Sequence, residues 1–391
     1  MKLPGNYPAF KQGRQEQKMS KVAVINCTEY EFDKVSMEFK RGISLLGGWQ
    51  QYIKPGDKVF LKLNLLMKKR PEEAVTTHPV VVEAVTKELL ALGARVIIGD
   101  SPGGPFTVRA LQNIYKATGI QEVAEKTGAE LNFNVEGLDV RFPEGKIIKK
   151  FHLCKAMVEA DKIISISKLK THQMTKFTGA VKVLFGAIPG LNKAEYHLKM
   201  PNINDFSNML IDLALCVNPV LHIMDGIVGM EGHGPSAGNP RQVGKLFLST
   251  NPFALDWVAL HVVGIRPKTI PTVSLAAKRN IYHGPDNGDF IGDKIETINP
   301  PFNAPEISGE VKFPLPKFIS DYLRPKPMFS PEVCIGCGQC AQHCPPKAIK
   351  IRNNFPDLNL QECIRCFCCQ ELCPHKAVEI KRSFLSKLLS R

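Results

Sequence analysis

The sequence predicts an α/β domain with a mainly parallel sheet, followed by a small cysteine-rich domain. From Lys21 to about residue 298, short β-branched runs alternate with longer amphipathic stretches, a pattern typical of βαβ units. Nine of the twelve cysteines fall between Cys334 and Cys373. We therefore expect a disordered extension over residues 1–20, an α/β domain over 21–298, a proline-rich linker over 299–327 and a small domain over 328–391.

The strands are predicted from apolar, β-branched runs bounded by charge, glycine or proline. They are Val22–Asn26, Lys58–Leu63, Arg95–Gly99, Lys162–Ile166, Val220–Met224 and Lys245–Ser249. Helices are predicted where apolar residues recur every three or four positions. They are Asp33–Tyr52, Pro79–Leu92, Val108–Thr127, Asp205–Cys216 and Phe253–Val263. Loops after parallel strands bind ligands in such sheets, and three here are unusual in composition: Asp100–Pro105, Ser167–His172 and Asp225–Pro235.

The stretch from Asn299 to Pro331 contains eight prolines. Proline excludes a long helix, so this stretch is predicted to be an extended connector. We expect it to be held against the α/β domain by its aromatic residues, Phe302, Phe313, Phe318 and Tyr322.

Composition excludes several classes of protein. A hydrophobic content of 44% with 8% aromatics is normal for a packed globule and argues against disordered and fibrous chains. Polar residues interrupt the most apolar stretch, Leu210–Met230, so no membrane span is expected. Residues Met1 to Ser20 lack the apolar core of a secretory signal, and either Met1 or Met19 would serve as the start. We expect a cytoplasmic protein, and its cysteines then indicate metal or redox chemistry rather than disulfides.

The formal net charge of +14 is consistent with several kinds of partner. Eight thiolates around two oxidised [4Fe–4S] clusters would lower it to about +10. The remaining basic residues form no arginine-rich run, and the chain has no zinc-finger spacing, so nucleic-acid binding is not expected. A basic surface suits an acidic redox protein, as donor or acceptor, or an anionic small molecule.

The cysteine spacing predicts iron–sulfur clusters. The motif C-x2-C-x2-C-x3-C-P begins at Cys334 and again at Cys363. In such motifs three cysteines surround one cluster, and the fourth ligates the other cluster. Structural zinc is the alternative, but zinc favours four thiolates in two pairs. The predicted ligand sets are Cys334, Cys337, Cys340 and Cys373 for one cluster, and Cys363, Cys366, Cys369 and Cys344 for the other.

Residues 328–382 resemble the bacterial two-cluster ferredoxin family on these motifs. The resemblance implies a ferredoxin-like α+β fold, electron transfer and an anaerobic setting. One departure is Cys368, which stands beside Cys369 where the family requires no cysteine. It is either a packed thiol or a competitor for the iron.

A basic segment in the α/β domain predicts an anion site. Lys168, Lys170 and His172 follow a predicted strand, and Lys182 falls in the first turn of the next helix, after Thr178–Gly179. Ammonium groups near helix N-terminal amides attract carboxylate or phosphate. The alternative is a solvated lysine face.

From Lys168 to His197, and again at Asp225–Pro235 and Asn251–Asp256, the chain resembles the family catalogued as domain of unknown function 362. Members are often fused to a two-cluster ferredoxin module, and the family implies no particular reaction. A weaker similarity, to the nickel-pincer lactate racemase family, covers His172, Thr178–Gly179 with Lys182, Pro189–Gly190 and His197. In that family the lysine anchors the cofactor and the later histidine ligates nickel. Here Val181 and Ala180 replace an arginine and a glycine of its pattern.

Other residues have two interpretations. Asp225, expected at the end of a strand, is a base or anchor, or a turn-forming residue. Glu231 and His233 are acid–base groups or solvated side chains. Asp256 is a pocket or capping residue. His78 marks the start of a helix, and a role in a site is the less favoured interpretation. Cys27, Cys154 and Cys216 are predicted to be reduced core thiols.

The leading hypothesis is an iron–sulfur oxidoreductase in which two [4Fe–4S] clusters pass electrons to an anionic molecule in the α/β domain. His172, Lys182, His197 and Asp225 are the predicted catalytic residues. Lys168, Lys170, Thr178 and Gly179 are predicted to bind this molecule or a further, unidentified cofactor. The alternatives are a non-enzymatic electron carrier or assembly factor, and a racemase-like isomerase with a pincer-type nickel cofactor.

Overall fold

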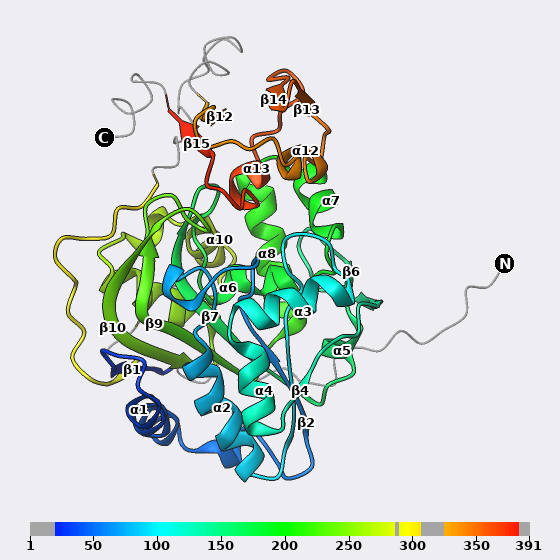
Figure 1. Cartoon of the computed structure of the whole chain (residues 1–391). Coiled ribbons are helices and arrows are strands. Elements are labelled where there is room, and N and C mark those ends of the chain that lie inside the picture. The colour runs from blue at the N-terminus through cyan, green and yellow to red at the C-terminus, as the bar shows by residue number, and fades with distance from the viewer. Residues whose placement is uncertain (1–19, 286–288, 306–323, 383–391) are drawn as a thin grey trace.

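The computed structural model describes residues 20–285, 289–305 and 324–382 (Figure 1). Phe313, Phe318 and Tyr322 of the linker, and nearly all of the extension expected over residues 1–20, lie outside the described residues. The described chain forms an α/β domain and a small C-terminal module. This is the fold class that the sequence predicts.

The α/β domain is built on one mixed sheet. Within the described residues its strand order is β11-β1-β10-β9-β7-β2-β3-β4, and β8 pairs with β7. Strands β4, β3, β2, β7 and β9 run parallel to one another, whereas β10 is antiparallel to β1 and β9. The bounds are β1 Val22–Asn26, β2 Lys58–Lys62, β3 Arg95–Gly99, β4 Glu130–Leu131, β7 Lys162–His172, β8 Lys176–Phe177, β9 Leu221–Glu231, β10 Asn239–Ser249 and β11 Phe290–Gly292.

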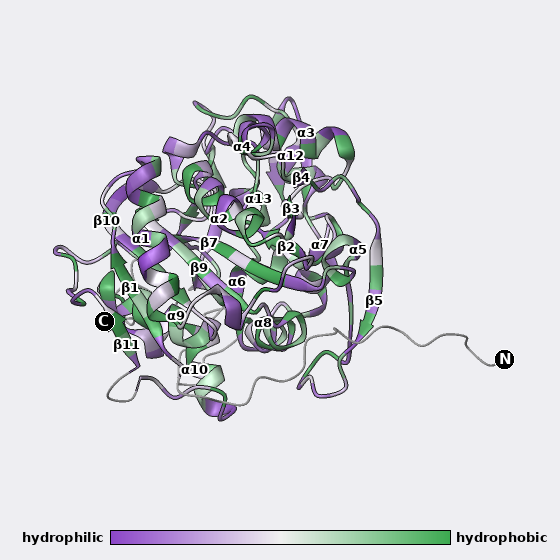
Figure 2. Cartoon of the chain, turned by 90° about the horizontal axis from the view of Figure 1, so that it is seen from below, coloured by the Kyte–Doolittle hydropathy of each residue, from purple (hydrophilic) through white to green (hydrophobic). Residues whose placement is uncertain are grey.

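Helices cover both faces of this sheet, and each layer has its own apolar core (Figure 2). One layer contains α1 (Phe32–Leu45), α2 (Pro79–Ala91), α3 (Val108–Ala117) and α4 (Ile120–Thr127). The other contains α6 (Ala180–Val183), α8 (Ile203–Val217), α9 (Pro252–Val262) and α10 (Pro271–Lys278). The remaining elements are α5 Lys155–Val158, α7 Asn192–Lys199, the hairpin of β5 Gly137–Arg141 and β6 Lys150–Cys154, and short 3-10 turns at Trp49–Gln51, Pro71–Glu73, Leu184–Ala187 and Pro267–Thr269.

Two helices are shorter than predicted because glycines with positive φ end them. Gly47 and Gly48, with φ of 95° and 84°, stop α1 before the predicted end at Tyr52. Gly119, with φ of 73°, divides the predicted helix Val108–Thr127 into α3 and α4. Only glycine adopts this conformation at little cost.

Two strands are longer than predicted. The stretches Ser167–His172 and Asp225–Pro235 are predicted as loops, but β7 continues to His172 and β9 to Glu231. Asp225 therefore lies within β9 and not at its end. The prediction failed because Lys168, Lys170 and Asp225 are buried and have partners inside the protein, as described below.

The C-terminal module lies at the top of Figure 1 and contacts the α/β domain through α13 (Cys368–Glu371). It contains two small antiparallel sheets. Strand β12 begins at Lys326, two residues before the boundary predicted at 328. Of the linker, Phe302 is buried in the α/β core. No described helix has the length and apolarity needed to span a membrane. The other elements are β12 Lys326–Phe329, α12 Gln339–Gln342, β13 Ile349–Arg352, β14 Phe355–Leu358 and β15 Val378–Lys381.

Candidate functional site

The module contains two cavities lined by cysteines. We call them the outer cavity, of about 350 Å³, and the inner cavity, of about 320 Å³. Within the described residues, no three or more His, Cys, Asp or Glu side chains are arranged to hold a single metal ion. Each cavity instead collects the four cysteines of one predicted ligand set. The outer cavity is lined by Cys334, Cys337, Cys340 and Cys373, and the inner cavity by Cys344, Cys363, Cys366 and Cys369.

The crossed arrangement follows from a duplicated backbone. Gly336 and Gly338 of the first motif have positive φ, and so do Arg365 and Phe367 at the equivalent positions of the second. Each loop therefore curls in the same way around its three cysteines. A short helix then follows, α12 in the first half and α13 in the second. It carries the fourth cysteine toward the other cavity. That these cysteines bind iron remains a prediction from their spacing.

Cys368 is the one cysteine of the module that the motif does not explain. The duplication aligns it with Gln339, which occupies the same place in the first motif and is not a cysteine. The thiol of Cys368 is buried and shares a hydrogen bond with Cys366. It contributes to the wall of the inner cavity and also to the wall of a second, larger cleft.

We predict that Cys368→Ala retains the full iron content, because the duplication aligns Cys369 with the motif cysteine Cys340. Iron and sulfide analysis after anaerobic purification checks this, with Gln339→Ala as the matched variant in the first motif. A loss of iron in Cys368→Ala alone would make Cys368 a ligand in place of Cys369.

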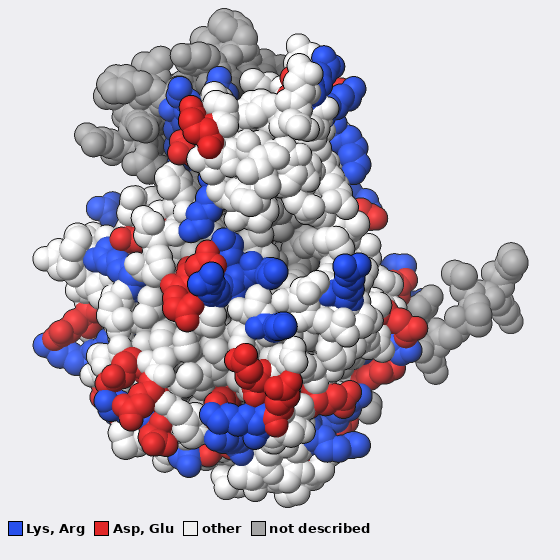
Figure 3. Space-filling model, viewed as in Figure 1, with Lys and Arg blue, Asp and Glu red and all other residues white. Residues whose placement is uncertain are grey.

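The larger cleft, of about 730 Å³, lies between the α/β domain and the module. Figure 3 shows a hollow at this junction with basic side chains on its border. The α/β domain contributes four lysines to its wall, and the module contributes His343, Cys368, Glu371 and Leu372. The four lysines are Lys62, Lys170, Lys182 and Lys193.

The cleft brings together five of the predicted site residues and leaves out three. Lys168, Lys170 and Lys182 were predicted as one group, but the pairing of β7 with β9 shifts register between Lys168 and Lys170. Lys168 lies opposite Asp225, whereas Lys170 and Lys182 line the cleft. Gly179 does not line the cleft because it packs against Asp256. Those that line the cleft are Lys170, His172, Thr178, Lys182 and His197. Those that do not are Lys168, Gly179 and Asp225.

Burial controls the charge of the cleft lysines. Lys170 is 1% exposed and donates a hydrogen bond to the carbonyl oxygen of Val75 at 2.5 Å. Burial lowers the pKa of Lys170 to about 7. Burial also lowers the pKa of Lys182, whose Nζ lies 4.9 Å from the ring centroid of Phe185. Among the described residues Lys182 has no hydrogen-bond acceptor, so its ammonium is available to a ligand.

His172 is held as a hydrogen-bond donor. Its Nδ1 accepts from the amide of Met174 at 3.0 Å, so the neutral ring carries its proton on Nε2. Burial lowers the pKa of His172, which favours this neutral form. The Nε2 atom lies 3.5 Å from Oε2 of Glu371. Burial would raise the pKa of Glu371, but His172, Lys182 and His197 together hold it well below its ordinary value.

His197 is also neutral. Burial lowers the pKa of His197 to about 3, and its ring stacks on Phe206 with the centroids 4.4 Å apart. Nδ1 of His197 has no hydrogen-bond partner within the described residues. The same holds for other buried atoms of cleft-lining side chains, namely Asn64 Oδ1, His172 Nε2, Thr178 Oγ1 and His343 Nδ1. Buried polar atoms are rarely left unsatisfied, so a polar ligand or ordered water is expected here.

The other part of the cleft wall includes an ion pair that sequence reasoning missed. Lys62 Nζ lies 2.6 Å from Oδ1 of Asp100, and Asp100 also accepts from the amide of Leu65. Lys193 donates to Ser101 Oγ at 2.8 Å. A lysine within the apolar run of β2 was a signal for this pair, because an unpaired buried lysine is costly.

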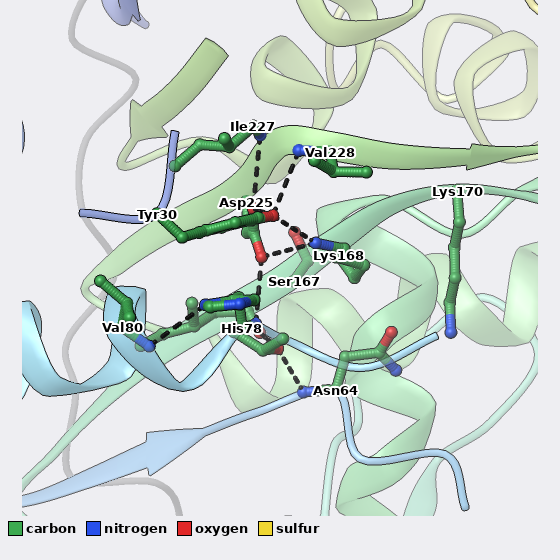
Figure 4. A network of polar contacts seen from close by, with 12 residues as sticks. Tyr30, Asn64, His78, Val80, Ser167, Lys168, Lys170, Asp225, Ile227 and Val228 are labelled. Atoms are coloured by element: carbon green, nitrogen blue, oxygen red, sulfur yellow. Dashed lines mark hydrogen bonds and ion pairs between the residues drawn. The ribbon is translucent and has the colours of Figure 1, made fainter. Parts of the chain in front are cut away.

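Lys168 and Asp225 form a separate buried network (Figure 4). Lys168 Nζ lies 2.8 Å from Oδ2 of Asp225 and donates to the hydroxyl of Tyr30 at 2.7 Å. Tyr30 donates to Oδ1 of Asp225, and the amide of His78 donates to Oδ2. The ring of His78 stacks on Tyr30 with the centroids 3.5 Å apart. These groups satisfy one another, so the network joins the segment before α1 to β7, β9 and the start of α2.

Asp256 positions the start of α6. Its carboxylate accepts from the amides of Ala180 at 2.5 Å and Val181 at 3.2 Å. Burial raises the pKa of Asp256 to about 7, although these two amides act in the opposite direction. A Cβ on Gly179 would lie 2.0 Å from Oδ1 of Asp256. Of the two roles considered, the structure favours capping, and Gly179 permits the close approach.

The glycine-rich stretch after Asp225 contacts the module. Gln370 is 1% exposed, and its Nε2 donates to the carbonyl oxygen of His233 at 2.8 Å. Ser236 Oγ lies 3.5 Å from the carbonyl oxygen of Gln370. Glu231 pairs with Arg241 at 2.8 Å. This stretch therefore docks α13.

As predicted, His78 precedes the first turn of α2, and the thiols of Cys27, Cys154 and Cys216 are free and buried.

Comparison with known proteins identifies both parts of the chain. Residues 59–261 match the domain of unknown function DUF362, and residues 326–374 match a 4Fe-4S dicluster domain. The chain belongs to the DUF362 family. Its C-terminal module is of the 4Fe-4S type, which indicates a role in electron transfer. This DUF362 protein is 31% identical over 303 residues to a thylakoid-associated protein of Synechocystis sp., a match that covers 76% of this chain and 92% of the relative.

Two solved structures are distantly similar. The lactate racemase apoprotein from Thermoanaerobacterium thermosaccharolyticum shares 16% identity with a TM-score of 0.37, covering 62% of this chain and 56% of that one. A protein from Thermotoga maritima shares 13% identity with a TM-score of 0.35, covering 65% of this chain and 60% of that one. The chain thus spans less than two thirds of either structure. Likeness this low transfers neither a reaction nor a cofactor.

Proposed function

We propose that this DUF362 protein is an iron–sulfur oxidoreductase that passes electrons to an anionic small molecule in the cleft between its two parts. The observation that carries this proposal is the position of Cys368, whose side chain contributes to the walls of both the inner cavity and the cleft. Electron tunnelling falls steeply with distance. A cluster in the inner cavity would therefore be a neighbour of the cleft ligand.

The cleft residues suit an anion. Lys182 supplies an amino group that has no hydrogen-bond acceptor among the described residues and whose charged form a bound anion would favour, and His172 presents an Nε2–H donor. Thr178 adds a hydroxyl group whose oxygen has no partner among the described residues. Glu371 offsets part of the positive charge and lies beside His172. Charge-assisted hydrogen bonds of this kind are about twice as strong as neutral ones.

That the module binds two clusters is also part of the proposal. The eight motif cysteines surround two cavities, so we expect two [4Fe–4S] clusters and a path from the outer cavity through the inner cavity to the cleft. The chain's own contribution is to hold the thiolates, bind the anion and enclose it between two domains. A bound cluster would supply the single electrons.

Lys182→Ala is expected to weaken binding of a small dianion such as oxalate by roughly ten- to a hundredfold, because it removes a charge-assisted contact of roughly 1.5–3 kcal/mol. Lys182→Arg should restore only part of the affinity, since a planar guanidinium does not replace a compact ammonium. Isothermal titration calorimetry measures this, with Lys199→Ala, a 70% exposed lysine of α7, as the matched control. Equal oxalate affinity in Lys182→Ala and Lys199→Ala would mean that the cleft lysines form only an ordinary basic surface.

The redox proposal is tested with the molecule that purifies with the protein. Mass spectrometry of material released by denaturation identifies it, and reduced protein is then mixed with it in a stopped-flow spectrometer. We expect cluster re-oxidation to saturate with ligand concentration, and Lys182→Ala to require more ligand without a change in cluster absorbance. A rate that stays linear in ligand and is the same in Lys182→Ala would contradict the proposal, because the ligand would then react outside the cleft.

A further inference from the structure

Exposed apolar side chains gather beside the outer cavity. Ile335 belongs to its wall and is 64% exposed. Val333 is 45% exposed and precedes the first ligand cysteine. Ile351 is 37% exposed and lies beside Gly338, because a Cβ on Gly338 would be 4.0 Å from Cγ1 of Ile351. Cys337, within the same loop, is exposed. We call Val333, Ile335, Cys337 and Ile351 the outer patch.

None of the described residues that line the inner cavity is exposed, although the two halves share one backbone pattern. Ile364, the counterpart of Ile335, is half-buried, and Phe367 is buried. The α/β domain covers this half. Gln370 of the module donates a hydrogen bond to the carbonyl oxygen of His233, and Leu372 packs so closely on Gly103 that a Cβ at Gly103 would lie 2.6 Å from it. Because α13 packs on the α/β domain, the inner half of the module is not accessible to a partner protein, whereas the outer half is accessible.

Charged residues of both signs border the outer patch. Lys350 and Arg352 flank Ile351 on β13, and both are exposed. Arg352 is 70% exposed and forms a surface ion pair with Asp357 at 3.1 Å. Glu332, next to Val333, supplies a negative charge. The net charge of about +10 that the chain keeps with two oxidised clusters favours a negatively charged partner.

We propose that the outer patch is the docking surface for an acidic, single-electron carrier protein. The carrier's redox centre would face Cys337, and the electron would enter at the outer cavity, opposite the side that meets the cleft. An apolar centre of a few side chains with a charged border is typical of a small, transient interface, which redox partners use. The direction of flow rests on the proposed function. The docking itself does not, because it concerns only how the outer cluster is reached.

The test measures reduction of the anaerobic full-length protein by flavodoxin hydroquinone, an acidic carrier, with dithionite as a small reductant that needs no docking surface. Ile335→Glu places a negative charge at the centre of the patch and should slow reduction by flavodoxin by about tenfold or more. Lys350→Glu should slow it less and weaken its dependence on ionic strength. Leu215→Glu is the matched control, because Leu215 is a 37% exposed leucine on α8 of the other domain. Iron content and dithionite rates should be the same in all three variants.

Each other outcome overturns the proposal. Flavodoxin rates in Ile335→Glu that equal those of Leu215→Glu would place docking elsewhere. Faster reaction with a basic carrier would reverse the electrostatic argument. A wild-type dimer in sedimentation velocity that Ile335→Glu dissociates would make the patch a contact between two copies of this chain. None of these measurements involves a cleft ligand, so their failure is distinct from failure of the cleft proposal.

Discussion

Replacing Cys373 by alanine is expected to remove the cluster of the outer cavity, although Cys373 belongs to the second motif. The outer cavity is lined by three cysteines of the first motif and by Cys373. The wild-type protein should carry about eight irons, and Cys373→Ala about four. Iron analysis and electron paramagnetic resonance of the reduced protein measure this loss.

Double variants show which cluster has been lost. Adding Cys334→Ala to Cys373→Ala should cost no further iron, because both cysteines line the outer cavity. Adding Cys344→Ala instead should remove almost all iron, because Cys344 lines the inner cavity. Cys216→Ala, a buried free thiol of α8, is the control and should keep all the iron. Loss of almost all iron in both double variants would instead mean that each motif ligates only its own cluster.

Breaking the Lys168–Asp225 pair is expected to destabilise the α/β domain strongly. Asp225 is 0% exposed and Lys168 0% exposed, so removing one partner leaves an uncompensated buried charge. Such changes cost roughly 3–5 kcal/mol. Lys168→Met and Asp225→Leu should each lower the urea midpoint seen by far-ultraviolet circular dichroism. The double variant should recover much of the loss, because two apolar side chains then replace two charges.

Lys34→Met provides the surface comparison. Lys34 pairs with Glu29, but both side chains are more than half exposed, at 52% and 55%. Water and salt screen such surface pairs, so the urea midpoint of Lys34→Met should hardly move. A small effect of Asp225→Leu combined with a large loss of oxalate binding would instead place Asp225 in the ligand site, where the sequence predicted a base or hydrogen-bond anchor.

Short-range signals in the sequence were sufficient for the fold class and for grouping the cysteines. Periods of two and of 3.6 residues report which side chains are buried, so the runs Val22–Asn26 and Arg95–Gly99 were predicted with their observed bounds. The two C-x2-C-x2-C-x3-C motifs place three cysteines within one loop, which local geometry alone constrains. The glycines after α1 and within Val108–Thr127 were also visible, but whether glycine ends a helix depends on the contacts beyond it.

Which residues line the cleft depends on contacts between residues far apart in the chain. Lys168 and Lys170 are two residues apart in β7, yet Lys168 pairs with Asp225 and donates a hydrogen bond to Tyr30, whereas Lys170 lines the cleft. Glu371 could not be assigned to this site from the sequence, because it enters only when α13 docks on the α/β domain. A one-dimensional pattern reports how a side chain relates to its own strand or helix. Which distant charge compensates a buried lysine, and which domain closes a cleft, follow from the packing of the whole chain.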